Sequence, residues 1–98
     1  MATGTRPQFI HYDLGTIGSD SVVEVTLSNA ANVQLLDATN FSSYQNGQPF
    51  RYYGGHVTES PYKIRPPRTD HWHVAIDLGG AAGTVRSSVR VIRGQKVG

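Results

Sequence analysis

Apolar and polar residues alternate along several short segments of the chain, which is the pattern of β-strands with one buried face. In segment 21–28 the apolar side consists of Val23, Val25 and Leu27. In segment 71–78 one face carries Trp72, Val74, Ile76 and Leu78, and the other carries His71, His73, Ala75 and Asp77. In segment 84–92 the inward positions are Val85, Ser87, Val89 and Val91. These segments predict strands that cover one core, and we expect Trp72 at its centre.

Shorter apolar segments add further strands between turn signals, at 9–12, 33–36, 51–53 and 62–64. The pair Gly54-Gly55 predicts a break or bulge where the backbone needs positive φ or a close approach. Only residues 35–46 approach a helical pattern, and their Asp, Asn, Ser and Thr side chains compete with a helix for backbone hydrogen bonds. We therefore expect one short helical turn near residues 40–46.

The last two strands, joined by the glycine-rich segment 79–83, predict a β-hairpin. Inward residues must pair with inward residues, which sets Leu78 opposite Val85 and Asp77 opposite Arg86. The expected fold is all-β: a two-sheet antiparallel sandwich of jelly-roll type with about seven or eight short strands. We expect a single domain over residues 8–93, with flexible ends at 1–7 and 94–98.

Composition narrows the functional classes. The 98 residues include no cysteine, which excludes disulfides and thiolate metal sites and fits a reducing, cytoplasmic setting. No signal peptide or membrane-spanning run is evident, so we expect no membrane partner. The net charge is +2, and residues 78–98 hold four basic residues and no acidic one. At this charge we expect no nucleic-acid partner, because such binding rests on many phosphate contacts.

The spacing His71-x-His73 puts two imidazoles on one face of a strand, with Asp77 further along that face. This string resembles the first metal motif of the cupins, with Asp in place of Glu, but the second cupin motif has no counterpart. A metal-dependent, cupin-like enzyme using these three residues is therefore one alternative. The other interpretation is two exposed histidines on a solvated strand. We find no nucleophile with a recognisable base and no paired carboxylates, and we expect no cofactor.

A polar loop region rich in aromatic residues is the other candidate site. It comprises Asn40, Phe41, Tyr44, Arg51, Tyr53 and Gly54. The sequence favours a non-catalytic binding or protein-interaction module that uses this surface. Single-stranded nucleic acid or sugar binding through Tyr44, Arg51 and Tyr53 is a further alternative. The structural interpretation is that alternate residues, such as Phe50 and Tyr52, fill the core while Arg51 and Tyr53 point outward. The sequence does not identify the ligand or protein partner. Homodimerisation through an edge strand or a sheet face is a further alternative.

Several segments in order resemble a small bacterial family, a domain of unknown function. They include Phe9-Ile10-His11-Tyr12, Arg51-Tyr52-Tyr53-Gly54-Gly55, His71-Trp72-x-Val74 and Val85-Arg86-x-Ser88-Val89. The resemblance covers about residues 8–93. It implies a compact β-sandwich that stands alone or precedes a TIR domain, and hence a sensing or interaction role. It implies no catalytic residues, since the family has no established reaction.

Overall fold

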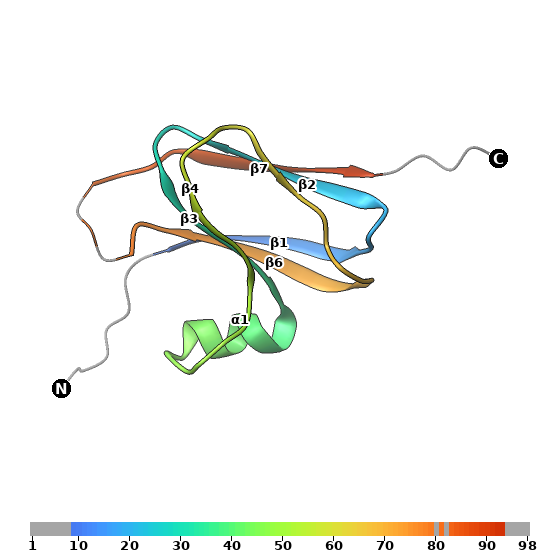
Figure 1. Cartoon of the computed structure of the whole chain (residues 1–98). Coiled ribbons are helices and arrows are strands. Elements are labelled where there is room, and N and C mark those ends of the chain that lie inside the picture. The colour runs from blue at the N-terminus through green and yellow to red at the C-terminus, as the bar shows by residue number, and fades with distance from the viewer. Residues whose placement is uncertain (1–8, 80, 82, 94–98) are drawn as a thin grey trace.

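The computed structural model describes residues 9–79, 81 and 83–93, which form two antiparallel sheets with one short helix (Figure 1). The strands are β1 (Phe9–Ile17), β2 (Ser21–Leu27), β3 (Ala31–Asp37), β4 (Tyr53–Val57), β5 (Tyr62–Ile64), β6 (Asp70–Asp77) and β7 (Ser87–Arg93). The helix is α1 (Ala38–Gln45). This architecture confirms the all-β, two-sheet prediction. The described residues contain no helix with the length and apolarity needed to cross a membrane.

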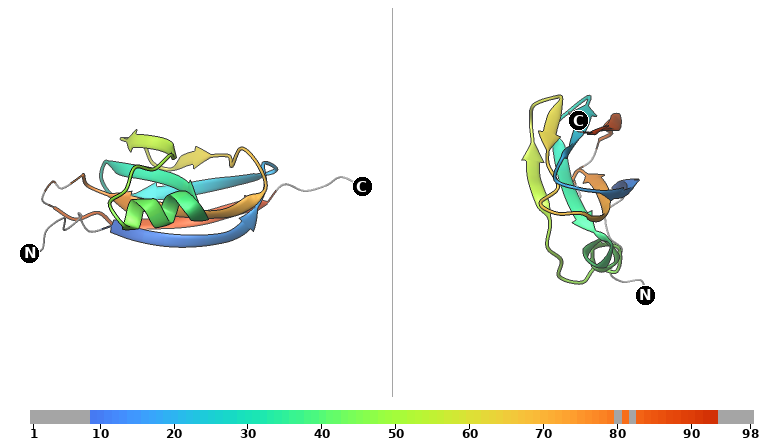
Figure 2. Two further views of the ribbon diagram at one scale, coloured as in Figure 1. Left: turned by 90° about the horizontal axis from the view of Figure 1, so that it is seen from below. Right: turned by 90° about the vertical axis from the view of Figure 1, so that its right-hand side faces the viewer.

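The larger sheet has the strand order β1-β6-β3-β4, and the smaller one has the order β5-β2-β7. The two layers are seen end-on in the right-hand view of Figure 2. There the edge strands β4 and β5 lie on the same side of the sandwich, one in each sheet. A jelly roll has eight strands, and the described residues contain seven, so the jelly-roll order stays a prediction.

The core lies between the two sheets and is built from the inward positions that alternation along the strands predicts. Trp72 is 0% exposed and lies within it, as expected. The indole Nε1–H donates to the carbonyl oxygen of Arg68 at 3.1 Å, so burial leaves this polar atom paired. Val23, Val33 and Val74 are also 0% exposed, and full burial of each such side chain stabilises the fold by about 1.5–3 kcal/mol.

Helix α1 covers the outer face of the larger sheet, away from the smaller one (Figure 1). Its buried residues Phe41 and Tyr44 pack with Leu36 and Ala75. Asp37 caps the helix, because its Oδ1 accepts a hydrogen bond from the backbone N–H of Asn40 at 2.8 Å. The expected helical turn near residues 40–46 is thus present and extends to an eight-residue helix.

The predicted hairpin between the last two strands is wrong. β6 pairs with β1 and β3, whereas β7 pairs with β2 in the other sheet. The pairs Leu78–Val85 and Asp77–Arg86 therefore do not form. Segment 79–83, partly outside the described residues, connects the two layers rather than two neighbouring strands. Inward residues face inward in either arrangement, so alternation alone could not distinguish them.

The glycine pair after segment 51–53 lies inside a strand rather than ending one. β4 runs from Tyr53 to Val57 and includes both glycines. Gly54 has φ +122°, and a Cβ there would lie 2.2 Å from the carbonyl oxygen of Val33. The expected positive φ and close backbone approach are both observed. Only glycine allows β4 to lie this near β3.

Candidate functional site

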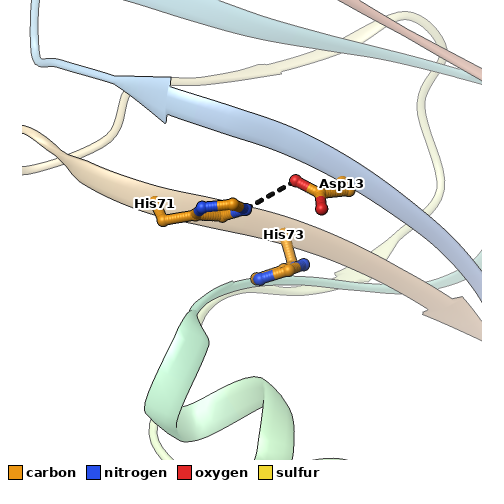
Figure 3. A group of neighbouring side chains, drawn as sticks. All are labelled: Asp13, His71 and His73. Carbon is orange, nitrogen blue, oxygen red and sulfur yellow. Dashed lines mark hydrogen bonds and ion pairs between the residues drawn. The ribbon is translucent and has the colours of Figure 1, made fainter.

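The outer face of β1 and β6 gathers four ionisable side chains beside α1. Asp13 and His73 lie directly opposite each other, with His11 and His71 two residues earlier on their respective strands. Figure 3 shows three of these side chains, Asp13, His71 and His73. Each has one possible metal-ligand atom, a carboxylate oxygen or an imidazole nitrogen, and these three atoms lie within 4.8 Å of one another. Among the described residues, no other group of three or more carboxylate and imidazole side chains brings its possible metal ligands this close together.

Asp13 is held in place by an irregularity in β1. The pairing with β6 shifts between Asp13 and Gly15, and Gly15 has φ +69°, which suits glycine. Oδ1 of Asp13 accepts hydrogen bonds from Gly15 N–H at 2.9 Å and from His71 Nε2 at 2.6 Å. These two hydrogen bonds hold the pKa of Asp13 below its ordinary value, and the bond from Gly15 has the larger effect. The carboxylate is therefore ionised and half exposed beside His71.

His73 is the buried member of the group, and it is 8% exposed. Burial lowers the pKa of His73, and the neighbouring His11 and His71 add to the effect against the opposing influence of Asp13. Its Nδ1 lies 2.9 Å from Nε2 of His11, so one of these nitrogens donates while the other carries a lone pair. Phe41 of α1 stacks on the His73 ring with centroids 4.6 Å apart. These contacts fix the ring and favour the neutral imidazole.

Asp77, the third residue of the predicted histidine motif, is not in this group. It lies four residues beyond His73 and opposite Phe9. Its carboxylate accepts hydrogen bonds from Tyr44, from Asn32 and from the Gly79 N–H. The acidic neighbour of the two histidines is Asp13 instead.

Sequence reasoning missed Asp13 and His11 because they come from a strand far away in the chain. The spacing His11-x-Asp13 was the available signal, since it repeats the two-residue period of His71-x-His73. Pairing of β1 with β6 then brings the two short motifs together.

The six residues of the other predicted site are divided between the interior and the surface. Phe41 and Tyr44 are 7% and 4% exposed and belong to the packing under α1. Asn40 lies at the helix start, where its Oδ1 accepts a hydrogen bond of 2.7 Å from the N–H of Arg51. Arg51 and Tyr53 are exposed, and Gly54 lies on the edge strand β4. The accessible part of this surface is thus the start of β4.

A hollow lies along this same edge. It has a volume of about 190 Å³ and is lined by residues 54–59 of β4 and the following loop and by Tyr62 of β5. The ring of Tyr53 packs edge-on against Trp72 with centroids 6.0 Å apart, although the residue is 45% exposed. The β4 edge therefore combines an edge strand, a shallow hollow and the ring of Tyr53, whose position is fixed by packing against Trp72.

A family model described as a domain of unknown function (DUF1883) matches residues 7–95. No curated protein matches the chain, and no solved structure matches it.

Proposed function

The chain belongs to the DUF1883 family, and we propose that it is a non-catalytic protein-interaction module. In this proposal, an extended segment of a partner protein pairs with the free edge of β4 and extends the larger sheet. The observation that carries the proposal is that, among the strands that the structure describes, β4 is an edge strand without the features by which proteins block such edges. Unpaired N–H and C=O groups along an open strand are complementary to another strand.

The other edge strands carry those protective features. β1 has a charged Asp13 and an irregular register. β5 is only three residues long, contains Lys63 and follows Pro61. β7 carries Arg90 and a further arginine at its end. β4, with the sequence YGGHV, has no acidic residue, lysine, arginine or proline. Charges, prolines, short length and bulges discourage edge pairing, so pairing is least hindered at β4.

The side chains beside β4 also suit an interface. Tyr52 and Tyr53 are 46% and 45% exposed, and tyrosine is enriched where protein partners contribute most to binding. The bond between Asn40 and Arg51 holds the segment that leads into the strand. A partner strand would therefore meet a surface that is already ordered, which lowers the entropic cost of binding.

The absence of cysteine agrees with a reducing compartment. We propose a bacterial cytoplasm as the setting. A role in interaction also agrees with the family resemblance, which implies that some members precede a TIR domain.

The test is selection of peptides from a displayed library of random 12-residue peptides against the untagged domain, followed by fluorescence polarisation with the selected peptides. We expect binding that the double variant Tyr52→Ala/Tyr53→Ala weakens at least tenfold. The matched control is Ile92→Ala, which removes an exposed apolar side chain on β7 and should leave binding unchanged. Backbone amide shifts on peptide addition should be largest in β4.

Three results would overturn the proposal. One is failure of the library to yield any binding peptide. Another is a dimer that the double variant dissociates, which would assign the edge to a second copy. The last is salt-dependent binding of a single-stranded oligonucleotide at Tyr52 and Tyr53 in place of peptide, which would assign the surface to nucleic acid.

A further inference from the structure

We propose that Asp13, His71 and His73 form a binding site for a divalent transition-metal ion of the zinc type. Two imidazole nitrogens and one carboxylate oxygen are a donor set that zinc uses in proteins. The three side chains come from β1 and β6, adjacent antiparallel strands whose pairing is interrupted only between Asp13 and Gly15. Such a scaffold holds ligands more rigidly than loops do.

The distances allow an ion to be accommodated by small side-chain movements. In a tetrahedral site with bonds of about 2.0–2.1 Å, ligand atoms are about 3.4 Å apart. The three candidate atoms lie within 4.8 Å of one another, and the Asp13–His71 pair is at 2.6 Å. An ion entering between these two would replace the shared proton of His71 Nε2, and the pair would separate slightly. Asp13 and His71 expose 55% and 45% of their side chains, which permits that movement.

His73 has the surroundings that a ligating histidine needs. In metal sites such a ring commonly donates its second N–H to another group, which fixes its tautomer and orientation. His11 Nε2 lies 2.9 Å from His73 Nδ1, and in the proposed site it accepts that N–H. Nε2 of His73 then becomes the metal ligand. Phe41 stacks on both imidazoles, with centroids 4.1 Å from His11 and 4.6 Å from His73.

Three protein ligands leave a fourth coordination position for water or for a donor group of a bound molecule. The half-exposed positions of Asp13 and His71 place that open position at the surface. This site is independent of the proposed peptide edge, because β1 and β4 lie at opposite ends of the larger sheet. Either assignment can fail without the other.

The experiment titrates zinc chloride into untagged, chelator-treated protein in competition with a chromophoric chelator. We expect one ion per chain for the wild type. Asp13→Asn and His71→Gln should each weaken zinc binding at least tenfold, and His11→Gln should weaken it by about 10–100-fold because it supports a ligand rather than being one. The matched control is His56→Gln, an exposed histidine on β4, and this variant should bind as the wild type does.

Cobalt provides a second readout, because tetrahedral Co²⁺ absorbs strongly in the visible range. Wild type and His56→Gln should show the band, and His71→Gln should not. Circular dichroism of every variant verifies that the fold is retained, and Asp13 and His71 are exposed enough for substitution to be tolerated. Unchanged zinc affinity in both Asp13→Asn and His71→Gln would overturn the proposal. So would wild-type binding only at millimolar zinc, which would indicate an adventitious ion.

Discussion

The hydroxyl of Tyr44 on α1 donates a hydrogen bond of 2.5 Å to Oδ2 of Asp77 on β6. The other carboxylate oxygen accepts from Asn32 Nδ2 and from the Gly79 N–H, both at 2.9 Å. Asp77 is 8% exposed, so these donors replace most of its water. The helix is therefore attached to the sheet by a buried polar contact as well as by apolar packing.

We expect Tyr44→Phe to lower the free energy of unfolding by about 1.5–3 kcal/mol, the usual contribution of a hydrogen bond to a charged group. The substitution keeps the ring, which packs against Phe9 and Phe50 with centroids 4.9 Å and 5.1 Å away. Urea unfolding monitored by fluorescence measures the change. Tyr52→Phe, at an exposed ring, is the control and should shift stability by less than about 0.5 kcal/mol. Equal effects of the two variants would contradict this account.

The same carboxylate predicts a pH dependence of stability. Burial alone would raise the pKa of Asp77, but the hydrogen bonds from Tyr44, Asn32 and Gly79 outweigh it and hold the pKa below its ordinary value. In the unfolded chain the pKa of this carboxyl group is about 3.9. Its stabilising effect is thus complete above that pH and is lost as the pH falls through the lower folded pKa.

Asp77→Asn should therefore be less stable than the wild type at pH 7, and the difference should shrink as the pH falls below about 4. Unfolding curves at a series of pH values measure it, and comparison of the two proteins at each pH cancels the other carboxylates. A difference that stays constant down to pH 3 would show that ionisation of Asp77 does not contribute.

The faces of the strands could be predicted from the sequence, because alternation is a local property. Trp72 and Val74 are buried as the pattern requires. The partners of the strands could not be predicted in the same way. The five-residue segment after Leu78 suits a hairpin, yet β6 and β7 on either side of it belong to different sheets. The sequence also shows little sign that α1 covers His73 and Asp77, because the helix has weak local propensity and is stabilised by tertiary packing.

The candidate metal site shows the same limit. The histidine spacing on β6 was visible in the sequence, but its carboxylate partner depends on which strand lies beside it. Asp77 is nearer in sequence and shares the outer face with the histidines. The backbone rise of about 3.3 Å per residue carries it away from His73. Asp13 is 60 positions from His73 in the chain and directly opposite it in the sheet.

Asp37 has two roles at the start of α1, and two substitutions separate them. Its Oδ1 accepts from the Asn40 N–H at 2.8 Å, and its Oδ2 lies 2.7 Å from Nη2 of Arg68. Asp37→Ala removes both and should cost about 0.5–2 kcal/mol through the lost cap. Asp37→Ser restores a capping oxygen without the ion pair. It should recover most of the loss, because Arg68 is half exposed and such pairs contribute only about 0–1 kcal/mol.

Hydrogen exchange of the α1 amides measures the effect of the cap locally, and urea unfolding measures it globally. We expect faster exchange at Asn40 in Asp37→Ala than in Asp37→Ser. If serine were no better than alanine, the ion pair with Arg68 would be the dominant contribution at this position.

Substitutions at Gly54 and Gly55 can separate two requirements for glycine in β4, the positive φ and the close approach of β4 to β3. Both have positive φ, so alanine strains the backbone at either position. Only at Gly54 would the new Cβ meet a backbone atom, the Val33 carbonyl oxygen at 2.2 Å, whereas at Gly55 nothing lies within 4 Å. We expect Gly54→Ala to cost about 1–3 kcal/mol more than Gly55→Ala, the usual penalty of forcing a packed structure apart.

Urea unfolding of the two variants measures that difference, and hydrogen exchange of the β3 amides shows whether β4 has separated from the sheet. Equal losses would mean that backbone strain alone requires the glycines. If β4 does separate in Gly54→Ala, the edge is displaced while Tyr52 and Tyr53 are retained. Peptide binding should then weaken although both tyrosines are present, because the proposed interaction uses the backbone of β4 as well as these side chains.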